Sequence, residues 1–368
     1  MHIDEAAIIR ILCNRTVAQR IRIRDIYKNL FNKGLINVID TNITDDSKKI
    51  LKILLLSPIE RNCYELRRIF KNANLDENIL IEIFLTSTNK QIKHILDYYN
   101  KLFESTVEQD IMKNRNTPSI KIFLALLQAN RPEDDTVDED EVCDDAKNLA
   151  ESQSKWRTDG STFIRLLCNR SNAHLKQTFA VYHRYSNVDI EDSIKTSANP
   201  DLSRTLMAIV RIIRNSVRFF AYELKKSLKG SSTNEDNLTR IIVSRSEIDM
   251  LQIKAEFEKI THRTLFDHIQ TDTKGNYRRA LLELLRQRIE PINKEMPFPQ
   301  LLDPPRRYRP TVQWKDSVSK QREIYTTRRF DRNNQAKSTT ISTIPIKPFR
   351  TRYHEQESYS NDNHDNEE

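Results

Sequence analysis

The sequence predicts an all-α protein built from four copies of one helical unit, followed by a C-terminal tail without regular structure. Three observations support this prediction. One eight-residue segment recurs four times, its apolar residues follow helical spacing, and only 4 glycines occur in 368 residues. The tight turns of a β-sheet protein commonly require glycine, so a chain with this few glycines is unlike a β-sheet protein.

The recurring segment keeps one phase along the chain. It occurs as IIRILCNR, LIEIFLTS, FIRLLCNR and LTRIIVSR, at Ile8–Arg15, Leu80–Ser87, Phe163–Arg170 and Leu238–Arg245. The copies are 72, 83 and 75 residues apart. The same offsets relate two further sets of positions, which are Tyr27, Tyr99, Tyr182 and Phe257, and Leu54, Leu126, Ile209 and Leu284. Agreement among several landmarks indicates true repeats.

Within each unit the apolar spacing is that of helices. In the fourth copy, Leu238, Ile241 and Ile242 stand at i, i+3 and i+4, which is one face of a helix. We therefore expect several short helices per unit, each burying one face against its neighbours.

The landmarks divide the chain into six segments. Repeat 1 covers residues 1–56 and is predicted to lack its first helix, because nothing before Met1 matches Glu60–Lys71 of repeat 2. Repeat 2 covers residues 57–128 and is followed by an acidic linker over residues 129–142. Repeat 3 covers residues 143–212, and repeat 4 covers residues 213–289. Residues 290–368 are predicted to be a disordered tail, basic and then acidic, since eight of the 12 prolines and no repeat lie there.

Composition narrows the functional class. No apolar run reaches the length of a membrane span, and the N-terminus does not resemble a signal peptide. The cysteines lack CxxC spacing and are expected to be reduced thiols of a cytoplasmic protein. The net charge of +8 favours an acidic partner. Motifs such as GxxxxGK[ST], HExxH and GxSxG are missing, so we do not expect an enzyme.

A specific resemblance is carried by the stretches around the fourth copy. Lys229–Glu235 (KGSSTNE) precedes it, Ser244–Asp249 (SRSEID) ends it, and Asp272–Leu281 (DTKGNYRRAL) follows. Together with the repeat spacing, these stretches resemble the annexins over roughly residues 1–289. The resemblance implies four repeats of five helices, with a K-G-x-G-T-D loop before the second helix of each repeat. It also implies calcium-dependent binding to acidic phospholipids such as phosphatidylserine.

In annexins that loop supplies backbone carbonyl oxygens to calcium, and a carboxylate arrives 38 residues beyond the aspartate of the GTD triplet. Calcium takes six to eight oxygen ligands, and glycine lets the chain turn so that carbonyls converge. In repeat 4 the resemblance assigns the carbonyls of Leu228, Gly230 and Ser232 and the carboxylate of Asp272. One Ca²⁺ site is expected there, weakened because Ser232 replaces a glycine.

The first three repeats depart from the annexin pattern. The carboxylate position holds Asn42, Asn114 and Ser197, while His2, Asn72 and Asn74 replace glycines and Arg157 puts a cation in the third loop. Substitute carboxylates are available at Asp40, Asp45 or Asp46 in repeat 1 and at Asp201 in repeat 3. In repeat 4 itself a structural alternative stays open, in which Thr233 and Asp272 only cap helices.

Trp156 matches a loop tryptophan that enters the lipid interface in the third repeat of some annexins. An indole suits that depth because it is apolar with one N–H donor. Trp156, Lys155 and Arg157 are therefore predicted to contact the membrane. The alternative for Trp156 is a half-buried anchor of its loop.

The predicted function is calcium-dependent phospholipid binding by a cytoplasmic protein that associates peripherally with plasma or vesicle membranes. The alternative is a calcium-independent membrane or protein-interaction scaffold that uses the basic part of the tail. A protein partner for the tail is one possibility, and a solvated extension is another. Nucleic acid is the least favoured partner, since pairs such as Tyr308 and Arg309 form no recognised module.

Overall fold

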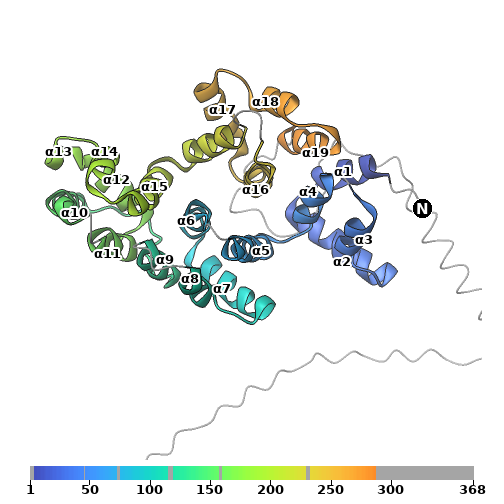
Figure 1. Ribbon diagram of the computed structural model, residues 1–368, viewed down its shortest axis with the longest axis horizontal. Helices are drawn as coiled ribbons and strands as arrows, with labels where there is room; N and C mark the ends of the chain where they lie inside the picture. Colours follow the sequence, from blue (N-terminus) through green and yellow to red (C-terminus); the bar gives the residue numbers. More distant parts are fainter. Residues whose placement is uncertain are drawn as a thin grey trace, which may run out of the picture. The chain divides into compact units, whose positions relative to one another are not determined.

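The computed structural model describes residues 4–44, 46–72, 75–114, 119–156, 160–228 and 233–286. Within these residues all regular structure is helical, as predicted, and the helices follow one another in four groups (Figure 1). Residues 287–368, which include almost all of the predicted tail, lie outside the described part of the chain.

The first two groups of helices lie within residues 1–56 and 57–128. Repeat 1 contains α1 (Glu5–Cys13), α2 (Val17–Phe31), α3 (Leu35–Asn42) and α4 (Ser47–Leu54). Repeat 2 contains α5 (Pro58–Lys71), α6 (Glu77–Thr86), α7 (Asn89–Phe103), α8 (Val107–Asn114) and α9 (Ser119–Leu127). The helix that α5 represents in repeat 2 has no counterpart among the described residues of repeat 1.

The last two groups share one long helix. Repeat 3 contains α10 (Glu139–Glu151), the 3-10 turn η1 (Gln153–Lys155), α11 (Ser161–Asn169), α12 (Asn172–Val181), α13 (His183–Ser186), α14 (Ile190–Ser197) and the start of α15 (Pro200–Ser227). Repeat 4 contains the end of α15, α16 (Glu235–Arg245), α17 (Met250–Thr261), α18 (Leu265–Asp272) and α19 (Gly275–Arg286).

The recurring segment lies in α1, α6, α11 and α16, and its apolar side chains lie in the core. The pairs Ile9 and Leu12, Leu80 and Ile83, Phe163 and Leu166, and Leu238 and Ile241 are all buried. The helix that follows starts with a polar cap. The hydroxyls of Thr16 and Thr88 each accept a hydrogen bond from the backbone N–H three residues on, and their own backbone N–H groups donate to the side-chain oxygen of the glutamine at that position, so each forms a capping box.

Two predicted boundaries differ from the structure. The linker predicted over 129–142 ends earlier, because Asp138 accepts hydrogen bonds from the backbone N–H groups of Asp140 and Glu141 and starts α10. The predicted boundary after residue 212 lies inside α15. That helix breaks at Asn215 (φ −161°, ψ 93°), whose side chain accepts from the N–H of Arg218 and caps the second half.

The first repeat packs against the last. α1 lies against α19, and the fully buried Arg20 of α2 donates to Glu247 at 2.6 Å and to the carbonyl of Arg15 at 2.7 Å. Glu247 also accepts from the N–H of Val17 at the start of α2. A charge pair that joins residues so far apart in the sequence holds repeats 1 and 4 in register. No helix in the described part of the chain is long and apolar enough to cross a membrane.

Candidate calcium site in repeat 4

The two ends of the loop between α15 and α16 are tied together. The N–H of Asn234 donates to the carbonyl of Ser227 at 2.8 Å, and the side-chain amide of Asn237 donates to the hydroxyl of Ser227 at 2.7 Å. Leu228 ends α15 with its side chain buried. Gly230 and Ser232 lie in the segment 229–232, outside the described residues.

Asp272 lies beside this loop. It is the last residue of α18, and its carbonyl oxygen accepts a hydrogen bond from the hydroxyl of Thr233 at 3.2 Å. Its carboxylate is 26% exposed and has His268 Nδ1 at 3.6 Å. The spacing read from the sequence therefore joins two parts of repeat 4, the end of this loop and Asp272, that lie next to each other.

Of the two helix caps considered as alternatives, the one at Thr233 is not found. The cap of α16 is Asn234, whose side chain accepts from the N–H of Asn237 at 3.0 Å, rather than Thr233. Asp272 stands at the C-terminal end of α18, where the partial negative charge of the helix disfavours a carboxylate.

Of the four residues that the resemblance assigns to calcium, the structure describes Leu228 and Asp272. Hard carboxylate and carbonyl oxygens are the ligands that calcium prefers. Within the described ranges no group of three or more His, Cys, Asp or Glu side chains could hold a metal ion. A metal site near Asp272 therefore has to take most of its ligands from backbone oxygens.

In repeats 1 and 3, the residues at the position that corresponds to Asp272 form hydrogen bonds to other groups. The amide of Asn42 donates to the carbonyl of Val38 at 2.8 Å, and Ser197 accepts from the amide of Gln153 at 2.8 Å. The substitute carboxylates form ion pairs, Asp40 with Lys52 and Asp201 with Arg204, both at 2.6 Å.

The pKa of Asp40 is lowered by its hydrogen bond to Lys52. Asp46 begins α4 without a side-chain capping bond, while Asp45, Asn74 and the side chain of Asn114 lie outside the description. Among the described candidates for the carboxylate, Asp272 is therefore the one next to a closed loop.

Trp156 is buried, which corrects the prediction that its indole faces lipid. Its ring packs against Phe163 and Tyr182, with centroid distances of 4.9 and 6.1 Å, and its N–H donates to the hydroxyl of Ser152 at 3.1 Å. The helical turn η1 directs the side chain inward, a local geometry that the sequence did not reveal. Lys155 is exposed, and Arg157 lies outside the described residues.

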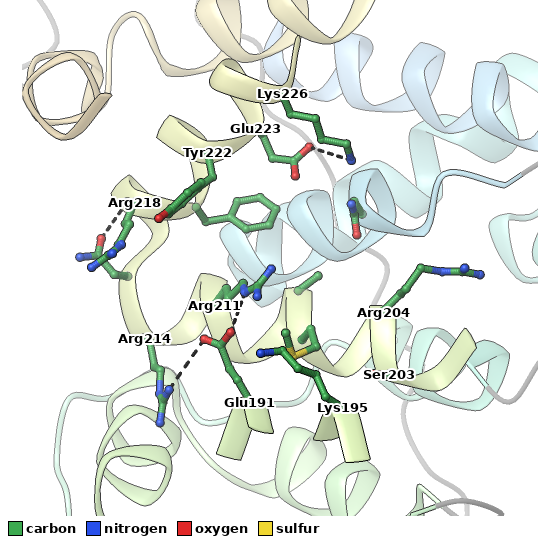
Figure 2. Close-up of a pocket in the computed structure, with 15 residues that line it drawn as sticks. Glu191, Lys195, Ser203, Arg204, Arg211, Arg214, Arg218, Tyr222, Glu223 and Lys226 are labelled. Atoms are coloured by element: carbon green, nitrogen blue, oxygen red, sulfur yellow. Dashed lines mark hydrogen bonds and ion pairs between the residues drawn. The ribbon is translucent and has the colours of Figure 1, made fainter. Parts of the chain in front are cut away.

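A cleft of about 960 Å³ follows α15 on both sides of its break (Figure 2). Six cations line it, yet each has a carboxylate within 4.0 Å. The pairs are Lys195–Asp192, Arg204–Asp201, Arg211–Glu191, Arg214–Asp189, Arg218–Glu256 and Lys226–Glu223. Each of these cations therefore has a carboxylate nearby that offsets part of its charge.

A second cleft of about 670 Å³ lies among α4, α5, α6 and α16. The nearly buried carboxylate of Glu82 pairs there with Arg240, and cations and carboxylates again alternate along the walls. Burial raises the pKa of Glu82, an effect that Arg240 opposes. Sequence analysis missed this pair, because neither residue stands in a recognisable motif.

Four helical repeats of about five helices each, with a helix-preceding loop beside a carboxylate, define a class of repeat proteins that can be compared with known families. The family model for annexins matches residues 1–54, 61–117, 144–209 and 219–284. The chain belongs to the annexin family, whose members generally bind phospholipids in a calcium-dependent way.

Individual annexins are similar to this chain over most of its length. Annexin A13 from Homo sapiens is 37% identical over 286 residues, which cover 77% of this chain and 90% of that protein. Annexin A4 from Homo sapiens is 36% identical over 282 residues, covering 76% and 88%.

Among solved structures, chicken annexin V in complex with Zn²⁺ has a TM-score of 0.71 at 36% identity, covering 77% of this chain and 90% of that one. Calcium-bound annexin (Sm)1 has a TM-score of 0.69 at 25% identity, covering 77% and 85%. The fold and the family predicted from the sequence are therefore confirmed. The predicted cofactor, Ca²⁺, is likewise supported by these annexin relatives and structures.

Proposed function

We propose that this chain binds phosphatidylserine-containing membranes through one calcium ion held in repeat 4. The ligands are the backbone carbonyls of Leu228, Gly230 and Ser232 and the carboxylate of Asp272. Water and lipid phosphate oxygens complete the shell, so that the ion bridges protein and bilayer.

The observation that carries this proposal is the contact between Thr233 and Asp272. It brings a partly exposed carboxylate to the edge of a loop whose ends are tied at Ser227 and Asn234. A single carboxylate and the loss of one loop glycine both favour weak binding, because fewer charges oppose the ion and the turn is less free. Lys155 and Arg157 are proposed additional contacts for anionic headgroups, each contributing about 1 kcal/mol near such a surface.

The proposal is tested by substituting Asp272→Ala and measuring calcium binding by calorimetry and calcium-dependent sedimentation with phosphatidylserine vesicles. We expect both signals to be lost. The matched control is Asp201→Ala, which removes the same charge from an exposed ion pair in repeat 3. If Asp272→Ala still sediments only with calcium, or if Asp201→Ala has the same effect, the site has been assigned to the wrong residues.

We further propose that the protein acts in the cytoplasm, at the plasma membrane or on vesicles. The alternative of a calcium-independent scaffold depends on the basic tail, which lies outside the described residues. Vesicle sedimentation across a calcium titration separates the two, since a scaffold of that kind would bind without responding to calcium.

A further inference from the structure

The second cleft lies where repeats 1, 2 and 4 meet. Side chains of α4, α5, α6 and α16 line it, together with Ile36 of α3 (Figure 1). Its volume of about 670 Å³ is of the size at which proteins bind small organic molecules. The charges and the apolar side chains along its walls indicate which kind of molecule fits.

Most cations of this cleft act on a carboxylate of the chain. The ion pairs are Lys49–Asp236, Lys52–Asp40, Arg68–Glu65 and Arg240–Glu82. The pKa of Asp40 is lowered by Lys52 and, less strongly, by Lys48. Arg61 differs, because it forms no ion pair with any described residue, and its buried Nη1 has no hydrogen-bond partner among them.

The carboxylates around Arg61 are already engaged. Glu60, the preceding residue, pairs with Arg24 at 3.0 Å, and Glu247 accepts a hydrogen bond from Arg20 at 2.6 Å. Burial and, after it, the charge of Arg20 lower the pKa of Arg61 to about 10, an effect that Glu247 opposes. Arg61 therefore still carries its positive charge at neutral pH.

A charge in the position of Arg61 is stabilised by an anion from outside the chain. Burying a charge without a partner is costly, and buried charges in proteins are normally paired. A guanidinium matches a carboxylate especially well, because two parallel N–H groups can donate to its two oxygens. A carboxylate that enters the cleft would supply the acceptor that the described residues do not.

Apolar side chains identify the rest of the occupant. Ile36, Ile53 and Leu56 are partly exposed where they line the cleft, and Tyr64 is 48% exposed. One unpaired cation matches a single negative charge, and aliphatic walls match a hydrocarbon chain. Inorganic phosphate fits less well, because it has no apolar part and carries more than one charge.

We propose that the second cleft binds an aliphatic carboxylic acid of the fatty-acid class, with its carboxylate on Arg61 and its hydrocarbon chain against Ile36, Ile53 and Leu56. This site is separate from the proposed calcium site, because none of these residues belongs to the loop of repeat 4. Binding of the acid requires no calcium.

The first test measures binding of decanoate to the 368-residue protein by calorimetry in EGTA. Decanol, which has the same chain length but no charge, should bind about tenfold more weakly, because it cannot form a charge-assisted bond with Arg61. Octanoate should also bind about tenfold more weakly, because it buries two fewer methylene groups.

Two substitutions separate the role of the charge from that of the apolar wall. Arg61→Met keeps most of the side-chain volume and should weaken decanoate about tenfold while leaving decanol unchanged. Ile53→Ser should weaken decanoate and decanol alike. The matched control is Arg68→Met, which removes a cation of the same helix and the same cleft that Glu65 already pairs with. It should change the affinity for decanoate less than about threefold.

Thermal unfolding distinguishes a binding residue from a structural one. Arg61→Met breaks no ion pair among the described residues, so its melting temperature should be no lower than that of the parent protein. Decanoate should raise the melting temperature of the parent more than that of the Arg61→Met variant, because it binds the folded parent more tightly.

Four results would overturn the proposal. Decanoate that fails to bind, or that binds equally well to the parent and to Arg61→Met, would remove Arg61 from the site. Decanol that binds as tightly as decanoate would show that charge does not select the ligand. Decyl phosphate that binds more tightly than decanoate would assign the cleft to a phosphorylated lipid. Because every readout is taken in EGTA, failure of the calcium site leaves all of them unchanged.

Discussion

The burial of Trp156 predicts a large loss of stability when its side chain is removed. Truncation of a fully buried large aromatic residue costs about 3–5 kcal/mol. The helical region extends to Arg286, and for that size each kcal/mol lowers the melting temperature by about 1.5–2 °C, so Trp156→Ala should melt about 5–10 °C below the parent protein. Trp156→Phe keeps the contacts with Phe163 and Tyr182 but loses the hydrogen bond to Ser152, and should cost about 1–2 kcal/mol.

The assay is thermal unfolding followed by circular dichroism, together with tryptophan fluorescence in a Trp314→Phe background that leaves Trp156 as the one fluorophore of its kind. We expect blue-shifted emission that acrylamide quenches poorly. Lys155→Ala, which changes an exposed neighbour, serves as the control for the melting experiment. A shift below about 2 °C in Trp156→Ala, or emission like that of free tryptophan, would refute the burial argument.

Three further predictions concern other buried or constrained groups. Burial raises the pKa of Asp110, but hydrogen bonds, led by the one from Tyr99 at 2.7 Å, outweigh burial and hold this pKa below its usual 3.8. Asp110→Asn should therefore lower the free energy of unfolding, measured in urea at pH 7, by about 1–3 kcal/mol. This difference between the two proteins should shrink as the pH falls below 3.8, because the carboxylate is then protonated. Burial raises the pKa of the Cys13 and Cys63 thiols to about 12. A thiol reagent at pH 8 should therefore label the partly exposed Cys143 and Cys168 first, and should label Cys13 and Cys63 only in denaturant. Gly275 has φ +61°, so Gly275→Ala should lose about 1–2 kcal/mol, although its new methyl group meets no atom within 4 Å.

Each of these has a contrary outcome. A stability difference for Asp110→Asn that stays constant from pH 7 to pH 3 would mean that its charge does not contribute. Four thiols reacting at one rate in the native protein would contradict the burial of Cys13 and Cys63. An unchanged melting temperature for Gly275→Ala would contradict the left-handed backbone at that position.

The repeat pattern allowed most of the fold to be predicted, because apolar spacing and polar caps are local signals. The contact of Asp272 with the loop of repeat 4 followed from one spacing, since in that repeat the end of α18 lies beside the start of α16. The direction of Trp156 did not follow, because one short 3-10 turn decides whether that side chain points inward. Arg240 and Glu82 were missed for a similar reason, as their pairing depends on how repeats 2 and 4 meet.

The hydrogen bonds between the two ends of the helical region affect how the protein folds. Asn276 donates to Glu5 at 2.6 Å, and the amide of Asn14 donates to Glu283 at 3.3 Å. An open array of repeats folds from neighbour to neighbour, whereas these contacts close a loop of most of the chain, at an entropic cost of about 5 kcal/mol. During synthesis repeat 1 therefore cannot complete its packing until repeat 4 has been made. In a chain truncated within repeat 4, the N-terminal helices should become disordered first, although they are far from the truncation in the sequence.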